Sequence, residues 1–158
     1  MANEISMDII EPLNEWLYAN GFVTTCTYVT GGDLEYNPAT DQIYIPSVYD
    51  IEPDSFFIKC LRKLGLKKKF KGFTMSILHE LGHAKTLDLF TDKESAKCDD
   101  IKKEYQVTID EDSDDYYYEY WKVKDEYAAN SWAVMYANCF PKKVKKLAKI
   151  IEENVNFG

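Results

Sequence analysis

The sequence has few of the features that mark membrane or secreted proteins. It has no stretch of about 18 apolar residues free of charge, which is the length that a membrane-spanning helix needs. Residues 1–8 carry acidic side chains where a secretory signal would carry Lys or Arg, and no apolar segment follows them. We therefore expect a soluble protein of the cytoplasm that does not act at a membrane.

Cysteine is scarce, and its placement excludes two further classes. The four cysteines stand singly and form no CxxC pair; they are Cys26, Cys60, Cys98 and Cys139. This spacing disfavours both a disulfide framework and a zinc cluster built from cysteine. We expect free thiols.

Positive charge is also in short supply. The chain carries 19 Lys and Arg residues against 27 Asp and Glu, a net charge of -8. Generic binding of nucleic acid or anionic lipid depends on an excess of basic residues, so we expect neither as a partner. Residues 110–115 are rich in acids, whereas 67–71 and 142–149 are rich in lysine. These runs are interpreted as solvated faces, with a partner-binding surface as the alternative.

What the chain does contain is enough apolar material for one core. With 158 residues and 46% hydrophobic side chains, we expect a single domain over residues 1–158. Helical periodicity and end signals predict helices at 5–18 (interrupted near Pro12), 53–64, 73–87, within 116–137 after an aromatic stretch, and from Pro141 onward. Strands are predicted at 22–29 and 42–46, and Pro46 places the second near a sheet edge. Residues 88–115 are charged and weakly periodic. The prediction is an α+β fold with a small antiparallel sheet packed on a helical bundle.

The two histidines of the chain lie in one short motif, His79-Glu80-Leu81-Gly82-His83. Helical residues four apart share a face, so both imidazoles could bind one metal ion, with Glu80 beside it. Zinc accepts neutral imidazole and lowers the pKa of a bound water to about 7. The motif therefore predicts His79 and His83 as Zn²⁺ ligands and Glu80 as the general base that activates the water.

A catalytic zinc normally has three protein ligands, so a third must come from elsewhere in the chain. Glu126 is the best candidate, because Ala129 and Ala133 would let its helix pack closely on the motif helix. Asn130, one turn later, could accept a hydrogen bond from the other nitrogen of a ligating histidine. The competing carboxylates are Asp125, Glu119, Glu104, Glu94 and Asp88; a cysteine ligand has no supporting pattern.

Two segments resemble the gluzincin metallopeptidases, and more narrowly the ImmA/IrrE-like family. Residues 73–83 resemble that family's F-T-x-x-H-E-L-G-H helix, and residues 126–133 resemble its later E-x-x-A-N-x-F-A helix. The resemblance implies a minimal zincin-like fold, with His79, His83 and Glu126 as zinc ligands and Glu80 as catalytic base. It also implies strands before the motif helix, one edge of which would bind an extended substrate.

The resemblance covers about a quarter of the chain and has clear departures. The first segment is longer than the family pattern between Thr74 and His79, and Trp132 replaces the usual Phe. A long acidic and tyrosine-rich segment separates His83 from Glu126, so the rim of the cleft should differ. Members of the family often cleave repressor proteins. They are frequently found beside a helix-turn-helix domain, which this chain does not show.

These patterns together predict a zinc-dependent peptidase that hydrolyses a protein or an extended peptide. Transition-state stabilisation needs a further donor, for which the candidates are Tyr116, Tyr117, Tyr118, Tyr120 and Tyr127. One alternative is a non-catalytic zinc-binding module, although a purely structural site needs no base such as Glu80. The other is an interaction or adaptor protein whose acidic tyrosine-rich stretch binds a basic partner.

Overall fold

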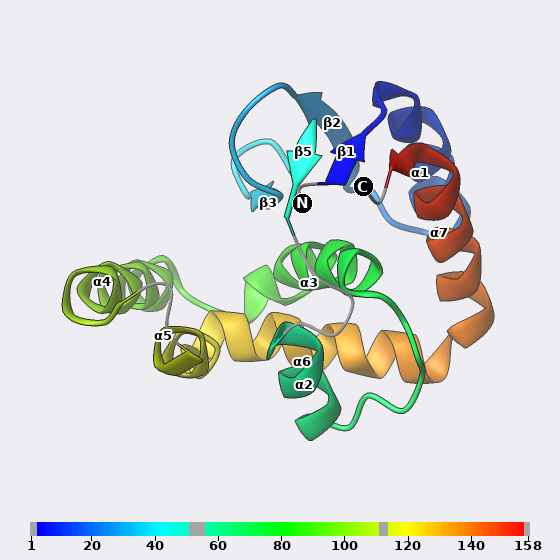
Figure 1. The fold of residues 1–158 in the computed structure, drawn as a ribbon. Helices are drawn as coiled ribbons and strands as arrows, with labels where there is room; N and C mark the ends of the chain where they lie inside the picture. Colours follow the sequence, from blue (N-terminus) through cyan, green and yellow to red (C-terminus); the bar gives the residue numbers. More distant parts are fainter. Residues whose placement is uncertain (1–2, 51–55, 111–113, 157–158) are drawn as a thin grey trace.

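The structure is a computed structural model that describes residues 3–50, 56–110 and 114–156, and it has the expected α+β composition (Figure 1). Its helices are α1 (Ile10–Ala19), α2 (Phe56–Lys63), α3 (Gly72–Thr86), α4 (Asp92–Thr108), α5 (Asp114–Tyr120), α6 (Lys124–Cys139) and α7 (Pro141–Asn154), with short 3-10 turns η1 (Met7–Ile9) and η2 (Leu87–Leu89). Its strands are β1 (Asn3–Ile5), β2 (Thr25–Val29), β3 (Glu35–Asn37), β4 (Gln42–Pro46), β5 (Val48–Tyr49) and β6 (Val155–Asn156). Within these described ranges, every helix is too short or too polar to cross a bilayer.

Helices α3 and α6 form the centre of the molecule. The strands lie on one side of α3, and α6 packs along the other (Figure 1). Apolar side chains lie all round α3, so it is buried along most of its length, as such a helix must be. Gly82 makes the close packing feasible, because a Cβ there would lie 2.4 Å from the carbonyl oxygen of Ala129. The predicted approach of the two helices through small residues is therefore confirmed.

The strands form two three-stranded sheets, where the sequence had suggested one antiparallel sheet. In the first, β1 pairs antiparallel with both β5 and β6 and so joins the two ends of the described chain. In the second, β4 pairs antiparallel with β3 but parallel with β2. The antiparallel prediction is thus wrong for β2, because β3 returns on the far side of β4 and leaves β2 and β4 running in the same direction.

The prediction that strand 42–46 lies at a sheet edge is also wrong. The order β2-β4-β3 places β4 in the middle of its sheet. Pro46 is tolerated there because β3 pairs only with Gln42 to Tyr44, so β3 no longer flanks the strand where the proline lacks an N–H. A proline at the last position of a strand therefore does not identify an edge.

Helices α1 and α7 close the core beside the sheets. Ile5, predicted to begin the first helix, instead lies in β1, and Pro12 is the third residue of α1, where a missing N–H breaks no helical hydrogen bond. The indole N–H of Trp16 donates to the carbonyl of Lys143 at 2.9 Å and joins α1 to α7. The predicted apolar stripe of the last helix is buried, at Val144, Leu147 and Ile151.

The predicted helix at 53–64 appears as α2, although its first part lies outside the described residues. The motif helix predicted at 73–87 is confirmed as α3. The four cysteines are present as thiols.

Helix α4 was not predicted from the sequence. Its charged sequence buries one residue, Cys98, so it has no apolar stripe for a periodicity search to find. The signal that was available is a capping box, in which the Thr91 hydroxyl accepts from the N–H of Glu94 and the Glu94 carboxylate accepts from the N–H of Thr91. Helices α4 and α5 lie together at one end of α3 and α6 (Figure 1).

Replacement of Gly82 by Ala should separate α3 from α6. We expect the free energy of unfolding in urea to fall by about 1–3 kcal/mol, the usual cost of overpacking, although alanine has the higher helix propensity. The matched control is Gly31→Ala, where a Cβ meets nothing within 4 Å. Equal stability of the two variants would show that the close contact does not constrain the fold.

Candidate metal centre

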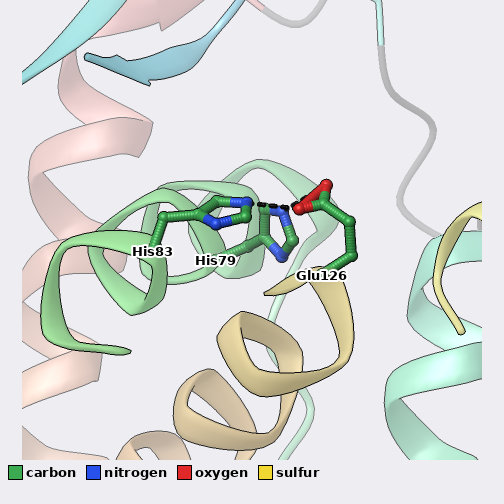
Figure 2. Close-up of side chains that lie close together, drawn as sticks. All are labelled: His79, His83 and Glu126. Carbon is green, nitrogen blue, oxygen red and sulfur yellow. Dashed lines mark ion pairs between the residues drawn. The ribbon is translucent and has the colours of Figure 1, made fainter. Parts of the chain in front are cut away.

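Two imidazoles from α3 face the same point in space. His79 and His83 lie one helical turn apart, with ring centroids 4.7 Å from each other and planes at 84° (Figure 2). His79 is buried, and His83 is partly buried. The sequence motif therefore produces two neighbouring nitrogen donors on a rigid, buried helix.

A carboxylate from α6 completes the group, as the sequence predicted. Glu126 lies in the first turn of α6 and is 3% exposed. Its Oε1 lies 3.5 Å from Nε2 of His79, and its Oε2 lies 2.5 Å from Nε2 of His83. One donor atom from each of the three residues falls within 4.8 Å of the others, a group that could hold a metal ion.

The competing carboxylates do not belong to this group of donors. Asp125 points to Lys102, with 2.7 Å between its Oδ2 and the lysine Nζ, and Glu119 pairs with Lys122 at 3.4 Å. Glu94 belongs to the capping box of α4, and both Glu104 and Asp88 are exposed.

The spacing of the three donors suits a metal ion bound between them. Glu126 Oε2 is buried and accepts no hydrogen bond among the described residues, although Nε2 of His83 lies 2.5 Å and Nζ of Lys102 lies 3.4 Å from it. Zinc ligands at about 2.0–2.1 Å in tetrahedral geometry lie about 3.3 Å apart, close to the 3.5 Å between His79 and Glu126. A cation between the three groups would bind this carboxylate oxygen directly.

Asn130 occupies the position predicted for it, beside His79. Its Oδ1 lies 2.6 Å from Nδ1 of His79, and both residues are buried. Because the amide oxygen can only accept, Nδ1 carries the proton and Nε2 is left to bind a metal. The hydrogen bond therefore fixes both the tautomer and the orientation of this imidazole.

The site is strongly coupled electrostatically. Burial alone would raise the pKa of Glu126, but the adjacent His79 and His83 hold it well below its usual range. Burial alone would lower the pKa of His79, whereas the Glu126 carboxylate raises it to about 9. A metal ion must compete with protons for these donors, as it does at any imidazole and carboxylate site.

Glu80 lies beside the three donors rather than among them. Its Oε2 accepts a hydrogen bond from the backbone N–H of Tyr36, in β3, at 3.1 Å. Burial raises the pKa of the Glu80 carboxyl, although the two histidines and the Tyr36 N–H act in the opposite direction. The position agrees with the one the motif predicted for a base, and the anchor from β3 was not foreseen.

Lys102 of α4 is a site residue that sequence reasoning missed. Its Nζ lies 2.7 Å from Asp125 and 3.4 Å from Glu126 Oε2. Burial would lower its pKa, but Glu126 and Asp125 raise it and keep the ammonium group charged. Nothing in the sequence around Lys102 sets it apart from the other lysines of its segment.

Two cavities open on the site. The first, of about 460 Å³, is lined by His79, and the second, of about 490 Å³, is lined by His83. Glu80, Tyr120 and Glu126 line both. Of the five tyrosines considered from the sequence, Tyr120 interacts with Glu126; burial first, and then that carboxylate, raise the pKa of its hydroxyl.

Tyr118 and Tyr127 are exposed on the surface. Tyr116 is buried against Tyr120, and Tyr117 lines the first cavity.

Comparison of the chain with known protein families, curated proteins and solved structures finds no match in any of the three.

Glu126→Gln should weaken zinc binding severely, because it removes the charged donor while keeping the side-chain volume. Loss of a hydrogen-bond partner of a metal ligand typically lowers affinity by about 10- to 100-fold. We expect the loss of zinc affinity in Glu126→Gln to be larger than this. Competition with a chromophoric chelator measures the affinity. Asp125→Asn, one residue away, is the control and should retain tight binding; the reverse ranking would remove Glu126 from the ligand set.

Asn130→Ala should lower zinc affinity by about 10- to 100-fold, because His79 loses the acceptor that fixes its tautomer. Asn130→Asp keeps an acceptor oxygen at the same position and should restore most of the affinity. The same chelator titration compares the two variants, with circular dichroism as a check on folding. Equal affinity in the parent and the Ala variant would show that the contact does not orient His79.

Proposed function

We propose that this chain is a zinc-dependent peptidase. The observation that carries the proposal is the convergence of His79 and His83 from α3 with Glu126 from α6, while Glu80 lies beside them and lines both cavities. A purely structural zinc site normally has four protein ligands and needs no carboxylate base. The donor set and the open cavities favour catalysis over that alternative.

Zinc is the metal that this donor set suits best. Two imidazoles and one carboxylate are a known ligand set of catalytic zinc, which leaves a coordination position open. When bound, zinc would act as a Lewis acid and lower the pKa of a water molecule to about 7. The resemblance of two short segments to the ImmA/IrrE-like peptidases, which implies a minimal zincin-like fold, also supports the proposal.

Glu80 is the proposed general base. A carboxylate held beside the ligands, and partly buried, can take a proton from the attacking water and later deliver it to the leaving amine. The Tyr36 N–H fixes one of its oxygens at 3.1 Å and leaves the other for this exchange. The role of β3 is then to position the base as well as to form one wall of the cleft.

Tyr120 is the proposed donor to the oxyanion that forms during hydrolysis. Its phenol interacts with Glu126 and lines both cavities, so it faces the place where a peptide carbonyl would lie. Its raised pKa keeps the hydroxyl protonated and able to donate.

Tyr120→Phe should lower kcat for peptide hydrolysis with little change in KM, because it removes the hydroxyl donor alone. An unchanged kcat would exclude this role.

The substrate is proposed to be an extended segment of peptide or protein. Strand β3 is an edge strand of its sheet, and its Glu35 and Tyr36 line the second cavity. An edge strand offers backbone groups along which an extended chain can bind, and in β3 these are groups other than the Tyr36 N–H, which donates to Glu80.

Glu80→Gln separates metal binding from catalysis. It keeps the size of the side chain and all three ligands, so zinc content should remain at one equivalent while hydrolysis of peptides falls by about 100-fold or more. Metal analysis and peptide turnover are measured on the same preparation. Glu119→Gln, at a partly exposed acid of α5 that pairs with Lys122, serves as control and should keep both properties.

Undiminished turnover in the Glu80→Gln protein would exclude Glu80 as the base. Tight zinc binding without any peptide hydrolysis in the parent would favour the non-catalytic module. Failure to bind zinc at all would favour the adaptor.

A further inference from the structure

The two cavities differ in the chemistry of their walls: the first is rich in aromatic rings, although Asp50 also lines it, and the second is rich in carboxylates. They meet at Glu80, Tyr120 and Glu126, which line both, and they lie on the two sides of the ligand group, since His79 lines one and His83 the other. A chain that crosses the site from one cavity to the other would place one residue in each. The walls of the two cavities therefore determine which substrate residues can lie on either side of the reactive centre.

The first cavity has an aromatic wall. We call the aromatic side chains that form this wall the aromatic arm; they are Tyr49, Phe56, Phe57, Tyr117 and Trp121. Trp121 is the centre of this group: it stacks on Phe56 with centroids 5.6 Å apart at 19°, and it packs against Phe57 at 5.3 Å. The rings come from different elements and hold one another in place, so the arm is a preformed apolar surface.

The second cavity has an acidic wall. Its acidic arm consists of Asp33, Glu35 and Asp99, which are exposed and come from two sides, the β3 region and α4. Among the described residues that line this cavity, Lys102 is the one lysine or arginine, and Asp125 and Glu126 bind its charge. Asp99 also acts on the charge of Lys102, whereas Asp33 and Glu35 are exposed to a cation that enters from solvent.

We propose that this site selects an extended peptide segment with a large apolar or aromatic side chain on one side of the reactive centre and a Lys or Arg on the other. The proposal rests on the peptidase function and specifies its substrate class. The aromatic arm receives the apolar side chain. The acidic arm receives the cationic one, whose positive charge complements a wall that would repel Asp or Glu.

Both contributions should be measurable. Loss of an apolar group from a pocket of this kind typically costs about 10- to 200-fold in kcat/KM. Clefts of one charge sign raise the local concentration of an oppositely charged ligand by about tenfold or more at low salt. Screening by salt shortens the range of the electrostatic attraction to about 8 Å at physiological ionic strength. The contribution of the apolar contact is insensitive to salt.

The test uses N-acetylated, internally quenched peptides that share one alanine-rich frame, so that no free terminal amine can replace a lysine. The set has Phe and Lys on opposite sides of a central bond in both orders, together with Ala in place of Phe and Glu in place of Lys. The zinc-loaded protein should prefer one order of Phe and Lys. Removal of Phe should cost about tenfold or more, and Glu in place of Lys about tenfold, the latter reduced by added salt.

Variants assign each preference to its arm. Trp121→Ala should abolish the advantage of Phe over Ala and keep the advantage of Lys over Glu. The double variant Asp33→Asn, Glu35→Gln should do the opposite. Glu11→Gln, Glu15→Gln removes the same charge from exposed positions on α1 and should change neither preference.

Binding separates this inference from the peptidase proposal. Anisotropy of fluorescein-labelled versions of the same peptides is measured on the zinc-loaded Glu80→Gln protein. Selective binding without hydrolysis by the parent would contradict the peptidase function and sustain the selectivity of the two arms. Hydrolysis or binding without preference, a preference for Glu over Lys, or no binding of any of these peptides would overturn the inference.

Discussion

The contact between Gly82 and Ala129 is the constraint on which the rest of the structure depends. Two helices far apart in sequence can approach this closely only because neither has a bulky side chain at the crossing, where a single Cβ on Gly82 would meet a backbone oxygen at 2.4 Å. This close approach of the helices sets Glu126 opposite His79 and His83, and it lets Asn130 reach Nδ1 of His79. A metal site with ligands from two helices needs such a fixed distance, because its donors tolerate errors of only about 0.2 Å.

The segment between His83 and Glu126 supplies many of the side chains that surround the site. Helix α4 contributes Asp99 and Lys102, and α5 contributes Tyr117 and Tyr120, so the segment supplies one wall of each cavity. Lys102 also places a positive charge beside Glu126 and links α4 to α6. The central helices therefore provide the proposed chemistry, whereas this segment provides the surroundings that would select a substrate.

The sequence was informative where local rules apply and uninformative where distant segments meet. The spacing of His79 and His83 predicted their shared face, and the small residues after Glu126 predicted close packing, because both follow from helical geometry alone. The parallel pairing of β2 with β4 depends on where β3 returns, which no local pattern encodes. Helix α4 has almost no buried face to reveal it, and the positions of Lys102 and Tyr120 depend on how α4 and α5 pack.

The central claim is that His79, His83 and Glu126 bind one metal ion together. A crystal of the zinc-loaded protein, with diffraction recorded above and below the zinc absorption edge, tests this most directly. The account predicts one anomalous peak about 2.0–2.2 Å from Nε2 of each histidine and from a carboxylate oxygen of Glu126. A peak held by other residues, or no peak between these three in a crystal that contains zinc, would contradict it.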